Sequence, residues 1–373
     1  AKAADPMRCL APSGGFLFQA RIRAIEQAHL LAVPPVPLMA RAAQALSDTA
    51  DHLLREQPAA TQVLAAIGPG NNGADALLCL QSLARRGYSV AAFTLQETPP
   101  ADAQAREVHA QWQAGGGTLT SLESLPGRLA QGAPPLLIDG LFGIGLSRPL
   151  GGAAARFAAL TSRFAGPVLA VDVPSGLDPD TGSVVGGPLA SAVHATRTVT
   201  MIADKPGLWT GQGRLHAGRV SLATLDLPAG VPDGLRIDRS WVRARLTRRS
   251  PVAHKGTFGT VAIVGGASDM PGAALLAAAG ARASGAGKVA TLGPDGPVFD
   301  PGDPQTMAWQ AERPCEFDAL FASTDALAVG CGLGRANAAR GLLGQALHQA
   351  VPLCLDADAL NLLAAAGPQD PSM

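Results

Sequence analysis

The stretch IGPGNNGADALLCLQSLARRGYSV, residues 67–90, joins the end of an apolar run to an Ala- and Leu-rich helical pattern. The turn between them holds three glycines, two asparagines and Asp75, which are residue types that favour turns and helix starts. A strand that passes directly into a helix is the basic unit of an α/β domain. The first N–H groups of such a helix can also bind an anion, so this turn is a candidate ligand site.

A purely structural interpretation of the turn is equally open, in which the glycines adopt positive φ and Asp75 caps the helix. Glycine-rich turns have many false positives as binding motifs. The stretch also lacks the G-x-G-x-x-G pattern, and no Walker lysine follows it. An ordinary dehydrogenase or P-loop enzyme is therefore disfavoured.

Similar apolar runs recur along the chain after two helical patterns, near residues 20–31 and 37–55. Continuous apolar runs with helices between them are typical of parallel strands that are covered on both faces. The runs are QVLAAIG (62–68), SVAAFTL (89–95), PPLLIDG (134–140), PVLAVDV (167–173) and RTVTMIA (197–203). We therefore predict a layered α/β domain.

This first domain is predicted over residues 7–228. The segment 229–250 is rich in Pro, Gly and Arg and has neither hydrophobic period, which is typical of a linker. Strand and helix patterns then restart, so residues 251–373 are predicted to form a second α/β domain. The patterns are TVAIVGG (260–266), a helix over about 271–284, KVATLG (288–293), DALAVG (325–330), a helix near 336–350 and PLCLDAD (352–358).

The bulk composition disfavours several classes of partner. With 29 basic and 29 acidic residues, the chain has no broad field that would attract nucleic acid or a membrane surface. It contains one Tyr and four Trp, which offers little surface for stacking bases. No apolar run reaches the roughly 18–20 residues of a membrane span. The five cysteines are scattered and odd in number, so we expect reduced thiols and a cytoplasmic protein.

Polar residues follow three of the predicted strands in the first domain. Asn71 and Asp75 come after the first run, Asp139 ends the third, and Asp172 and Ser175 follow the fourth. In an open parallel sheet, ligands bind outside the carboxyl ends of the strands. Carboxylate, amide and hydroxyl groups that converge there can hold a cation through oxygen ligands or place a base beside a ligand.

These residues also carry a family resemblance. GPGNNGAD (68–75), IDGLFGIGLSRPLGG (138–152) and VDVPSGLDPDTG (171–182), in this order and spacing, resemble the NAD(P)H-hydrate epimerase family. The later ADKPGLWTGQGRLHAGRV (203–220) and the upstream RAIEQAHLLAVPPVPLMARAA (23–43) resemble the same family. Several independent motifs therefore agree.

The resemblance, which covers about residues 20–228, implies a Rossmann-like fold. It also implies interconversion of the R and S epimers of hydrated NADH and NADPH (NADHX and NADPHX), damaged cofactors that carry water on the nicotinamide ring. Asp172 would lie at the reacting ring as the catalytic residue, either as a base or as an electrostatic stabiliser of a cationic ring. A potassium ion would be held by Asn72, Asp139 and Ser175. The hydrate pocket would be lined by Asn71, Asn72, Gly73, Ala74, Asp75, Gly143, Ile144, Gly145, Leu146, Ser147, Arg148, Pro149 and Asp172.

The chain departs from the family pattern at three of these motif positions. Ala74 and Ala76 stand where the family usually has glycine, so a positive φ or a close backbone approach there would be strained. Ile144 replaces a common threonine of the pocket loop. Of the neighbouring polar residues, we expect Asp178 and Asp180 to organise their own loop. Lys205 could contact a phosphate, but we expect a solvated lysine.

The second half resembles the ADP- or ATP-dependent NAD(P)H-hydrate dehydratase family. The resemblance rests on HKGTFGTVAIVGGASDMPGAALLAAAGARASGAGKV (254–289), AVGCGLG (328–334) and LCLDADALNLLA (353–364). It implies a partial ribokinase-like domain that, with ADP or ATP and Mg²⁺, would remove water from the S epimer. By position, Ala273, Gly332 and Gly334 would approach the hydrate. Asp356 and Asp358 are either site residues or caps of the helix that starts near Ala359.

The late G-x-G-D element of ribokinase-like enzymes is not found in the sequence, and Cys331 replaces a usual proline. We therefore expect epimerase activity and no complete nucleotide-dependent dehydratase site in residues 251–373. The substrates implied are the small molecules NADHX and NADPHX, with a homo-oligomer possible. The alternative is a non-catalytic nucleotide-metabolite binding or interaction protein on the same fold. Retention of Asn72, Asp139, Asp172 and Ser175 favours the enzyme.

Overall fold

A computed structural model describes residues 15–32, 36–57, 62–95, 100, 102–129, 133–246, 248–310 and 314–366. The chain divides into two compact units, Ala1–Leu246 and Thr247–Met373. Each unit contains its own sheet and its own hydrophobic clusters. No helix among the described residues is long and apolar enough to cross a membrane.

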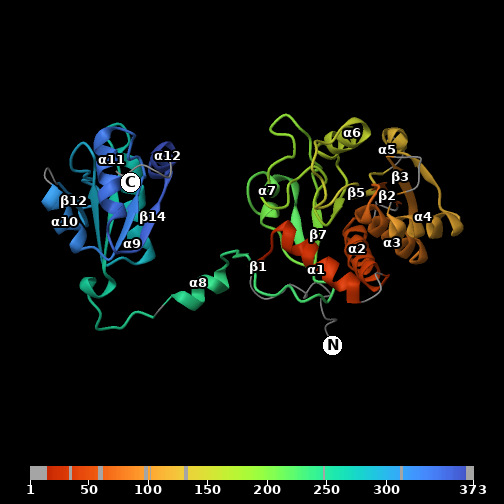
Figure 1. The fold of residues 1–373 in the computed structure, drawn as a ribbon, viewed down its shortest axis with the longest axis horizontal. Coiled ribbons are helices and arrows are strands. Elements are labelled where there is room, and N and C mark those ends of the chain that lie inside the picture. Colours follow the sequence, from red (N-terminus) through yellow and green to blue (C-terminus); the bar gives the residue numbers. More distant parts are fainter. Residues whose placement is uncertain are drawn as a thin grey trace. The chain divides into compact units, whose positions relative to one another are not determined.

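The first unit is built on a seven-stranded sheet in which every neighbouring pair is parallel (Figure 1). The strand order is β4-β3-β2-β5-β6-β7-β8. The strands are β2 (Gln62–Ile67), β3 (Ser89–Thr94), β4 (Leu119–Ser121), β5 (Leu136–Gly140), β6 (Val168–Val171), β7 (Arg197–Met201) and β8 (Arg219–Ala223). The helices are α1 (Gln19–Ala32), α2 (Val36–Glu56), α3 (Asn71–Arg85), α4 (Ala103–Ala114), α5 (Leu125–Leu129), α6 (Gly152–Thr161) and α7 (Gly213–His216), with short turns η2 (Leu122–Ser124) and η3 (Pro206–Leu208).

Both faces of this sheet are covered, as the continuous apolar runs require. Alternate residues of β2 point to opposite faces, so Val63, Ala65 and Ile67 pack with α2 and α3. Leu64 and Ala66 pack instead with α6 on the other face. The predicted α/β class and the three-layer, Rossmann-like arrangement are therefore confirmed.

The strand order reverses between β2 and β5. The chain runs outward from β2 through β3 to β4 and then returns to β5, which pairs with the other side of β2. Such a switch point opens a crevice at the carboxyl ends of the two strands. It also brings the turn after β2 next to the loop after β5.

The close approach of the turn after β2 to the loop after β5 depends on glycines. A Cβ at Gly68 would lie 1.7 Å from the carbonyl oxygen of Leu141, and a Cβ at Gly73 would lie 2.1 Å from the oxygen of Gly68. Ala74 and Ala76 lie inside α3 and neither has a positive φ, so the strain considered for them does not arise. The Cβ of Ala76 is accommodated because β5 has Gly140, which has no side chain, at the point where that Cβ approaches the strand.

The second unit has a five-stranded parallel sheet of order β12-β11-β10-β13-β14. Helices α10, α11 and α12 contribute to the core on one face, and α9 packs on the other. The strands are β10 (Thr260–Val264), β11 (Lys288–Leu292), β12 (Thr306–Trp309), β13 (Ala326–Val329) and β14 (Leu353–Leu355). The helices are α9 (Pro271–Ser284), α10 (Pro314–Ala322), α11 (Asn337–Leu347) and α12 (Ala357–Ala366), with the turn η4 (Lys255–Phe258).

Some elements were not predicted. The edge strands β4, β8 and β12 consist mostly of half-buried or exposed residues, so they lack a continuous buried apolar run. The segment 229–250, predicted as a linker, contains β9 (Gly234–Leu235), which pairs with β1 (Gly15–Phe16), and helix α8 (Arg239–Arg245). Asp238 caps α8 by accepting a hydrogen bond from the Trp241 amide. The limits of the two domains and of the linker stay a prediction.

We predict that Gly68→Ala destabilises the first unit by about 3 kcal/mol or more, because its Cβ meets backbone that cannot move aside cheaply. The matched control is Gly70→Ala, two residues along the same turn, where a Cβ meets nothing within 4 Å. Urea unfolding followed by circular dichroism measures both changes. Equal stability of the two variants would contradict the close approach of β2 and the β5 loop.

Candidate active site

The three polar strand ends meet at the crevice beside the switch point. Asn72 lies in the first turn of α3, Asp139 near the end of β5, and Asp172 and Ser175 directly after β6. Because β2, β5 and β6 are consecutive in the sheet, their carboxyl ends share one edge. The structure therefore brings together the residues that the sequence singles out.

Asn72 and Asp172 meet at Gly143. The amide nitrogen of Asn72 donates to the carbonyl of Val171 at 3.0 Å, which fixes the orientation of the side chain. A Cβ at Gly143 would lie 2.8 Å from Asn72 Oδ1 and 3.5 Å from Asp172 Oδ2. Glycine at this position therefore lets the loop lie directly over the two oxygens.

Asp139 and Ser175 form a buried pair beneath this loop. The hydroxyl of Ser175 donates to Asp139 Oδ1 at 2.7 Å, and the Ser175 amide donates to Oδ2 at 2.8 Å. The Ser175 hydroxyl also accepts from the Phe142 amide at 2.9 Å. Burial raises the pKa of Asp139 to about 6, although the hydrogen bonds from Ser175 and Leu141 oppose that rise.

Lys205, expected to be solvated, is instead fully buried and ion-paired with Asp172. Its Nζ lies 2.6 Å from Asp172 Oδ1 and also donates to Thr200 Oγ1 and the carbonyl of Met201. The expectation was wrong because Lys205 follows β7, which is the next strand of the same sheet edge. The rule that ligands bind outside the carboxyl ends of parallel strands, applied to β7 as it was to the other strands, would have identified Lys205 as a site residue.

Asp172 is held in an unusual conformation. Its φ is +64°, in the left-handed region that non-glycine residues seldom occupy. Oδ1 accepts hydrogen bonds from Lys205 and from the Met201 amide at 2.9 Å. Ile202, which also borders the cavity, has a φ of +67°, and such strain in a β-branched residue persists only where the surroundings hold it.

These groups line a cavity of about 460 Å³. Asn71, Asn72 and Asp75 border it from α3, and Gly143, Ile144, Gly145 and Leu146 from the β5 loop, together with Asp172. Helices α1 and α2 supply further lining, including Glu26 and Met39. Of the other predicted pocket residues, Gly73 and Ala74 are buried within α3, whereas Ser147, Arg148 and Pro149 are exposed on the loop. The site roles of all these residues stay a prediction.

Helix α1 is anchored to the cavity loops. The side chains of Gln19 and Arg23 both donate to the carbonyl of Ile144. The backbone N–H of Gln19 donates to Asp180 Oδ1 at 2.8 Å. Asp178 accepts three hydrogen bonds from Asp180 and Thr181, so it organises its own loop as expected. The first turns of α1 are thereby fixed over the crevice.

Two further carboxyl groups of the cavity have raised pKa values. Burial raises the pKa of Asp75 well above its ordinary value, and the charges of Asp172 and Glu26 add to the rise. Asp75 Oδ1 is buried and has no hydrogen-bond partner among the described residues. Burial and the charge of Asp172 likewise raise the pKa of Glu26. Glu26 was not predicted, because it lies on a helix remote in sequence from the strand ends.

The second unit also has a glycine loop at a switch point, between β10 and β13. Gly332 has a φ of +62°, and a Cβ there would lie 2.9 Å from the Cβ of Ala273, so the predicted hydrate contacts are neighbours. The Gly334 amide donates to Asp358 Oδ2 at 2.9 Å. Asp358 therefore fixes the glycine loop, and Asp356 lies 3.5 Å from the sulfur of Cys331.

Fold and site define a class: a pair of parallel α/β domains with a ligand crevice at the switch point of the first sheet. A family model described as YjeF-related protein N-terminus matches residues 36–207, and one described as NAD(P)H-hydrate dehydratase matches residues 261–371. The chain belongs to the family of bifunctional NAD(P)H-hydrate repair enzymes.

Two relatives illustrate this membership. The bifunctional NAD(P)H-hydrate repair enzyme Nnr of Mycobacterium tuberculosis (strain ATCC 25618 / H37Rv) is 35% identical over 354 residues, covering 92% of this chain and 68% of that protein. The enzyme of the same name from Moorella thermoacetica is 32% identical over 358 residues, covering 89% and 66%. The chain thus spans about two thirds of the length of the curated relatives that it matches.

Among solved structures, the ADP/ATP-dependent NAD(P)H-hydrate dehydratase of Bacillus subtilis, co-crystallized with ATP/Mg²⁺, is 34% identical. The match covers 32% of this chain and 45% of that chain, with a TM-score of 0.27.

We predict that Lys205→Met destabilises the first unit by about 3–5 kcal/mol, because it leaves the charge of Asp172 buried and unpaired. The double variant Lys205→Met/Asp172→Asn should lose less than the sum of the two single changes, since it contains neither charge. Urea unfolding at pH 7 measures all three. The control is Arg156→Met, which breaks an exposed ion pair with Glu123 and should cost about 1 kcal/mol or less. A similarly small loss at Lys205 would contradict the buried pair.

We also predict that Asp75 makes stability depend on pH. A carboxyl whose native pKa is raised contributes stability that is complete below its ordinary pKa near 3.8 and is lost as the pH rises through the native value. Asp75→Asn removes that dependence, so the melting temperature of the variant should fall less than that of the parent between pH 5 and pH 8. Asp226→Asn, at an exposed carboxylate, should leave the dependence unchanged.

Proposed function

We propose that this chain interconverts the R and S epimers of NADHX and NADPHX in the cavity of the first unit. The observation that carries the proposal is the divided environment of Asp172. Lys205 and the Met201 amide hold Oδ1, whereas Oδ2 lies beside Asn72 and Gly143 at the cavity. Membership of the repair-enzyme family supports the same activity.

The cavity offers the two kinds of group that epimerisation requires. Inversion of the hydrated carbon breaks its bond to the hydroxyl while the ring nitrogen supplies an electron pair, which leaves a cationic ring. Water then adds to the opposite face and loses a proton. The negative charge of Asp172 stabilises the cationic ring. Asp75 and Glu26, whose pKa values are raised, are suited to give the leaving hydroxyl its proton and to recover one afterwards.

We propose that potassium binds beside this cavity on Asn72, Asp139 and Ser175. All three offer oxygen, and each has lone pairs left after the hydrogen bonds described above. Phe142 and Gly143 are consecutive in the loop, and they contact Ser175 and Asn72 respectively, so the donors lie around one short segment. A monovalent cation there would offset the buried charge of Asp139 and hold the loop over the substrate.

For the second unit, we propose only that Ala273, Gly332 and Gly334 contact the hydrate. Dehydration would additionally require ADP or ATP with Mg²⁺ and the G-x-G-D element that the sequence does not contain. The close packing of Gly332 against Ala273 supports a shaped contact surface at this switch point.

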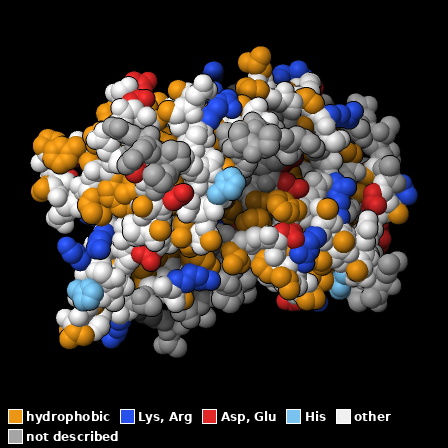
Figure 2. All heavy atoms as spheres, turned by 60° about the vertical axis from the view of Figure 1, so that its left-hand side comes forward, with side chains coloured by type: hydrophobic (Ala, Val, Ile, Leu, Met, Phe, Trp, Pro, Cys, Tyr) orange, Lys and Arg blue, Asp and Glu red, His pale blue; other side chains and the backbone are white. Residues whose placement is uncertain are grey.

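We further propose a cytoplasmic protein that binds neither nucleic acid nor membranes and can form homo-oligomers. Cys79, Cys331 and Cys354 are free thiols, which fits a reducing compartment. On the face drawn in Figure 2, Lys and Arg side chains are interspersed with Asp and Glu. No large patch of a single charge sign that would attract a polyanion is visible on that face.

The test is epimerisation of purified R-NADHX and R-NADPHX, coupled to an independent S-specific dehydratase with ATP. We expect conversion that potassium accelerates relative to tetramethylammonium at equal ionic strength. Asp172→Asn should lower kcat at least 100-fold, because the charge that stabilises the cationic ring is lost. Exposed Asp226→Asn serves as the control. A folded chain that binds the hydrate but converts it no faster than solution would overturn the proposal and favour a metabolite sensor.

A further inference from the structure

A second cavity of about 280 Å³ lies in the first unit, in the groove between α2, α3 and α4. Two residues, Met39 of α2 and Gln104 of α4, line both this groove and the active-site cavity. The two spaces are therefore neighbours that share a wall. Nothing in the epimerisation chemistry uses the groove, since Asp172, Asp75 and Glu26 all border the first cavity.

The groove combines an apolar wall with unengaged polar groups. Met39, Leu78 and Val108 supply apolar surface from three helices. The Ser82 hydroxyl and the side-chain amide of Gln104 make no hydrogen bond in the described part of the chain. A concave, mostly apolar cavity with a few convergent polar groups is the usual form of a small-molecule site.

The groove continues along α3 away from the catalytic residues. Leu78 and Arg85 both border it, seven and fourteen residues after Asn71. At a rise of 1.5 Å per residue, these positions lie about 10 Å and about 21 Å along the helix from its first residue. A ligand whose reacting group lies at the helix start would reach the groove only if it carried a second recognition group at a distance. A dinucleotide has that shape.

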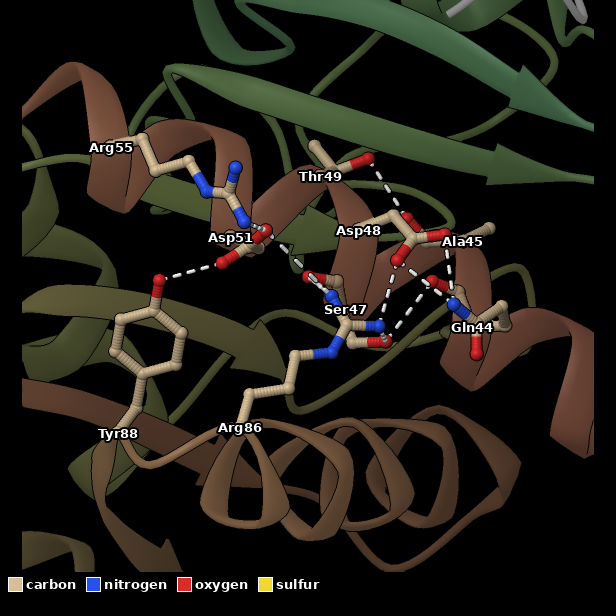
Figure 3. A network of polar contacts seen from close by, with 9 residues as sticks. All are labelled: Gln44, Ala45, Ser47, Asp48, Thr49, Asp51, Arg55, Arg86 and Tyr88. Carbon is tan, nitrogen blue, oxygen red and sulfur yellow. Dashed lines mark hydrogen bonds and ion pairs between the residues drawn. The ribbon is translucent and has the colours of Figure 1, made fainter. Parts of the chain in front are cut away.

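Two adjacent arginines at the end of α3 have different environments. Arg86 donates to Asp48 and to Ser47, and Asp51 binds both Arg55 and Tyr88, in a network that ties α2 to the end of α3 (Figure 3). Arg85 borders the groove, is exposed, and has no hydrogen bond or ion pair with the described residues. Among the described residues, Arg85 is therefore an unpaired cation at the end of the groove that is farther from the start of α3.

We propose that this groove binds the adenosine half of the dinucleotide substrate, and that Arg85 contacts the 2′-phosphate that distinguishes NADPHX from NADHX. Glu107 also borders the groove and accepts a hydrogen bond from Gln111. The carboxylate of Glu107 would repel a phosphate and can accept hydrogen bonds from ribose hydroxyls. The preference for the phosphorylated substrate is therefore assigned to Arg85, whose guanidinium can bind a phosphate. The identity of the ligand rests on the function proposed above.

The experiment compares Arg85→Gln with the parent on the full chain. We expect the ratio of kcat/KM for NADPHX to that for NADHX to fall about tenfold, mainly through KM for NADPHX, with kcat for NADHX unchanged. Titration calorimetry with 2′,5′-ADP and 5′-AMP as probes should show a preference for 2′,5′-ADP that the variant loses. Arg163→Gln, at an exposed arginine after α6, is the charge-matched control. It should change neither the NADPHX-to-NADHX ratio of kcat/KM nor the preference for 2′,5′-ADP over 5′-AMP.

A second variant, Ser82→Trp, fills the groove without removing charge. It should raise KM for both hydrates and weaken binding of both probes, while the melting temperature confirms folding. An unchanged NADPHX-to-NADHX ratio in Arg85→Gln, together with equal binding of the two probes by the parent, would overturn the subsite even if epimerisation is normal. If no hydrate is converted by any variant, the epimerase proposal fails, and the probe titrations still decide whether the groove binds an adenosine phosphate.

Discussion

The first unit depends on one buried ion pair. Lys205 is fully buried, and Asp172 and three polar oxygens surround its ammonium group and compensate for the loss of water. In return, it fixes one oxygen of Asp172 and links the end of β6 to the turn after β7. Replacing such a pair by apolar residues is often tolerated thermodynamically, so stability alone is a weak reason for its presence. Orientation of a reactive carboxylate is a stronger one.

The same site places its carboxyl groups in different environments. Asp172 faces a lysine, Asp139 faces the hydrogen bonds of Ser175, and Asp75 faces the cavity without a hydrogen-bond partner in the described chain. Burial acts on all of them, but only the first has an ammonium group within 3 Å. Burial raises the pKa values of Asp139 and Asp75, and perturbed carboxyl pKa values in one site are characteristic of acid and base roles. The strained backbone at Asp172 is consistent with this, because strain collects where geometry is set by function.

The sequence was sufficient for the buried strands of the first sheet and for much of the crevice, because both depend on local sequence. Apolar runs such as QVLAAI mark buried parallel strands, and the polar residues directly after them must meet at one edge. Glu26, Met39 and Gln104 could not be found in this way, because their place at the cavity depends on how α1, α2 and α4 pack over the sheet. Half-exposed edge strands such as β8 also escaped, since burial on two faces is what gives a strand its apolar pattern.

This division between strand ends and helix surfaces has a consequence for specificity. The groups that we propose to act on the reacting ring lie at strand ends and on the first turn of α3, where backbone hydrogen bonds and close glycine contacts leave little freedom. Groups that border the neighbouring groove sit on the surfaces of three helices, where a side chain can change without moving the backbone. Ile144, in the loop after β5, belongs to the first set, whereas Arg85 belongs to the second. Chemistry and recognition of the distant half of a ligand can therefore vary independently in this architecture, because a specificity residue on a helix need not disturb Asp172 or Asn72.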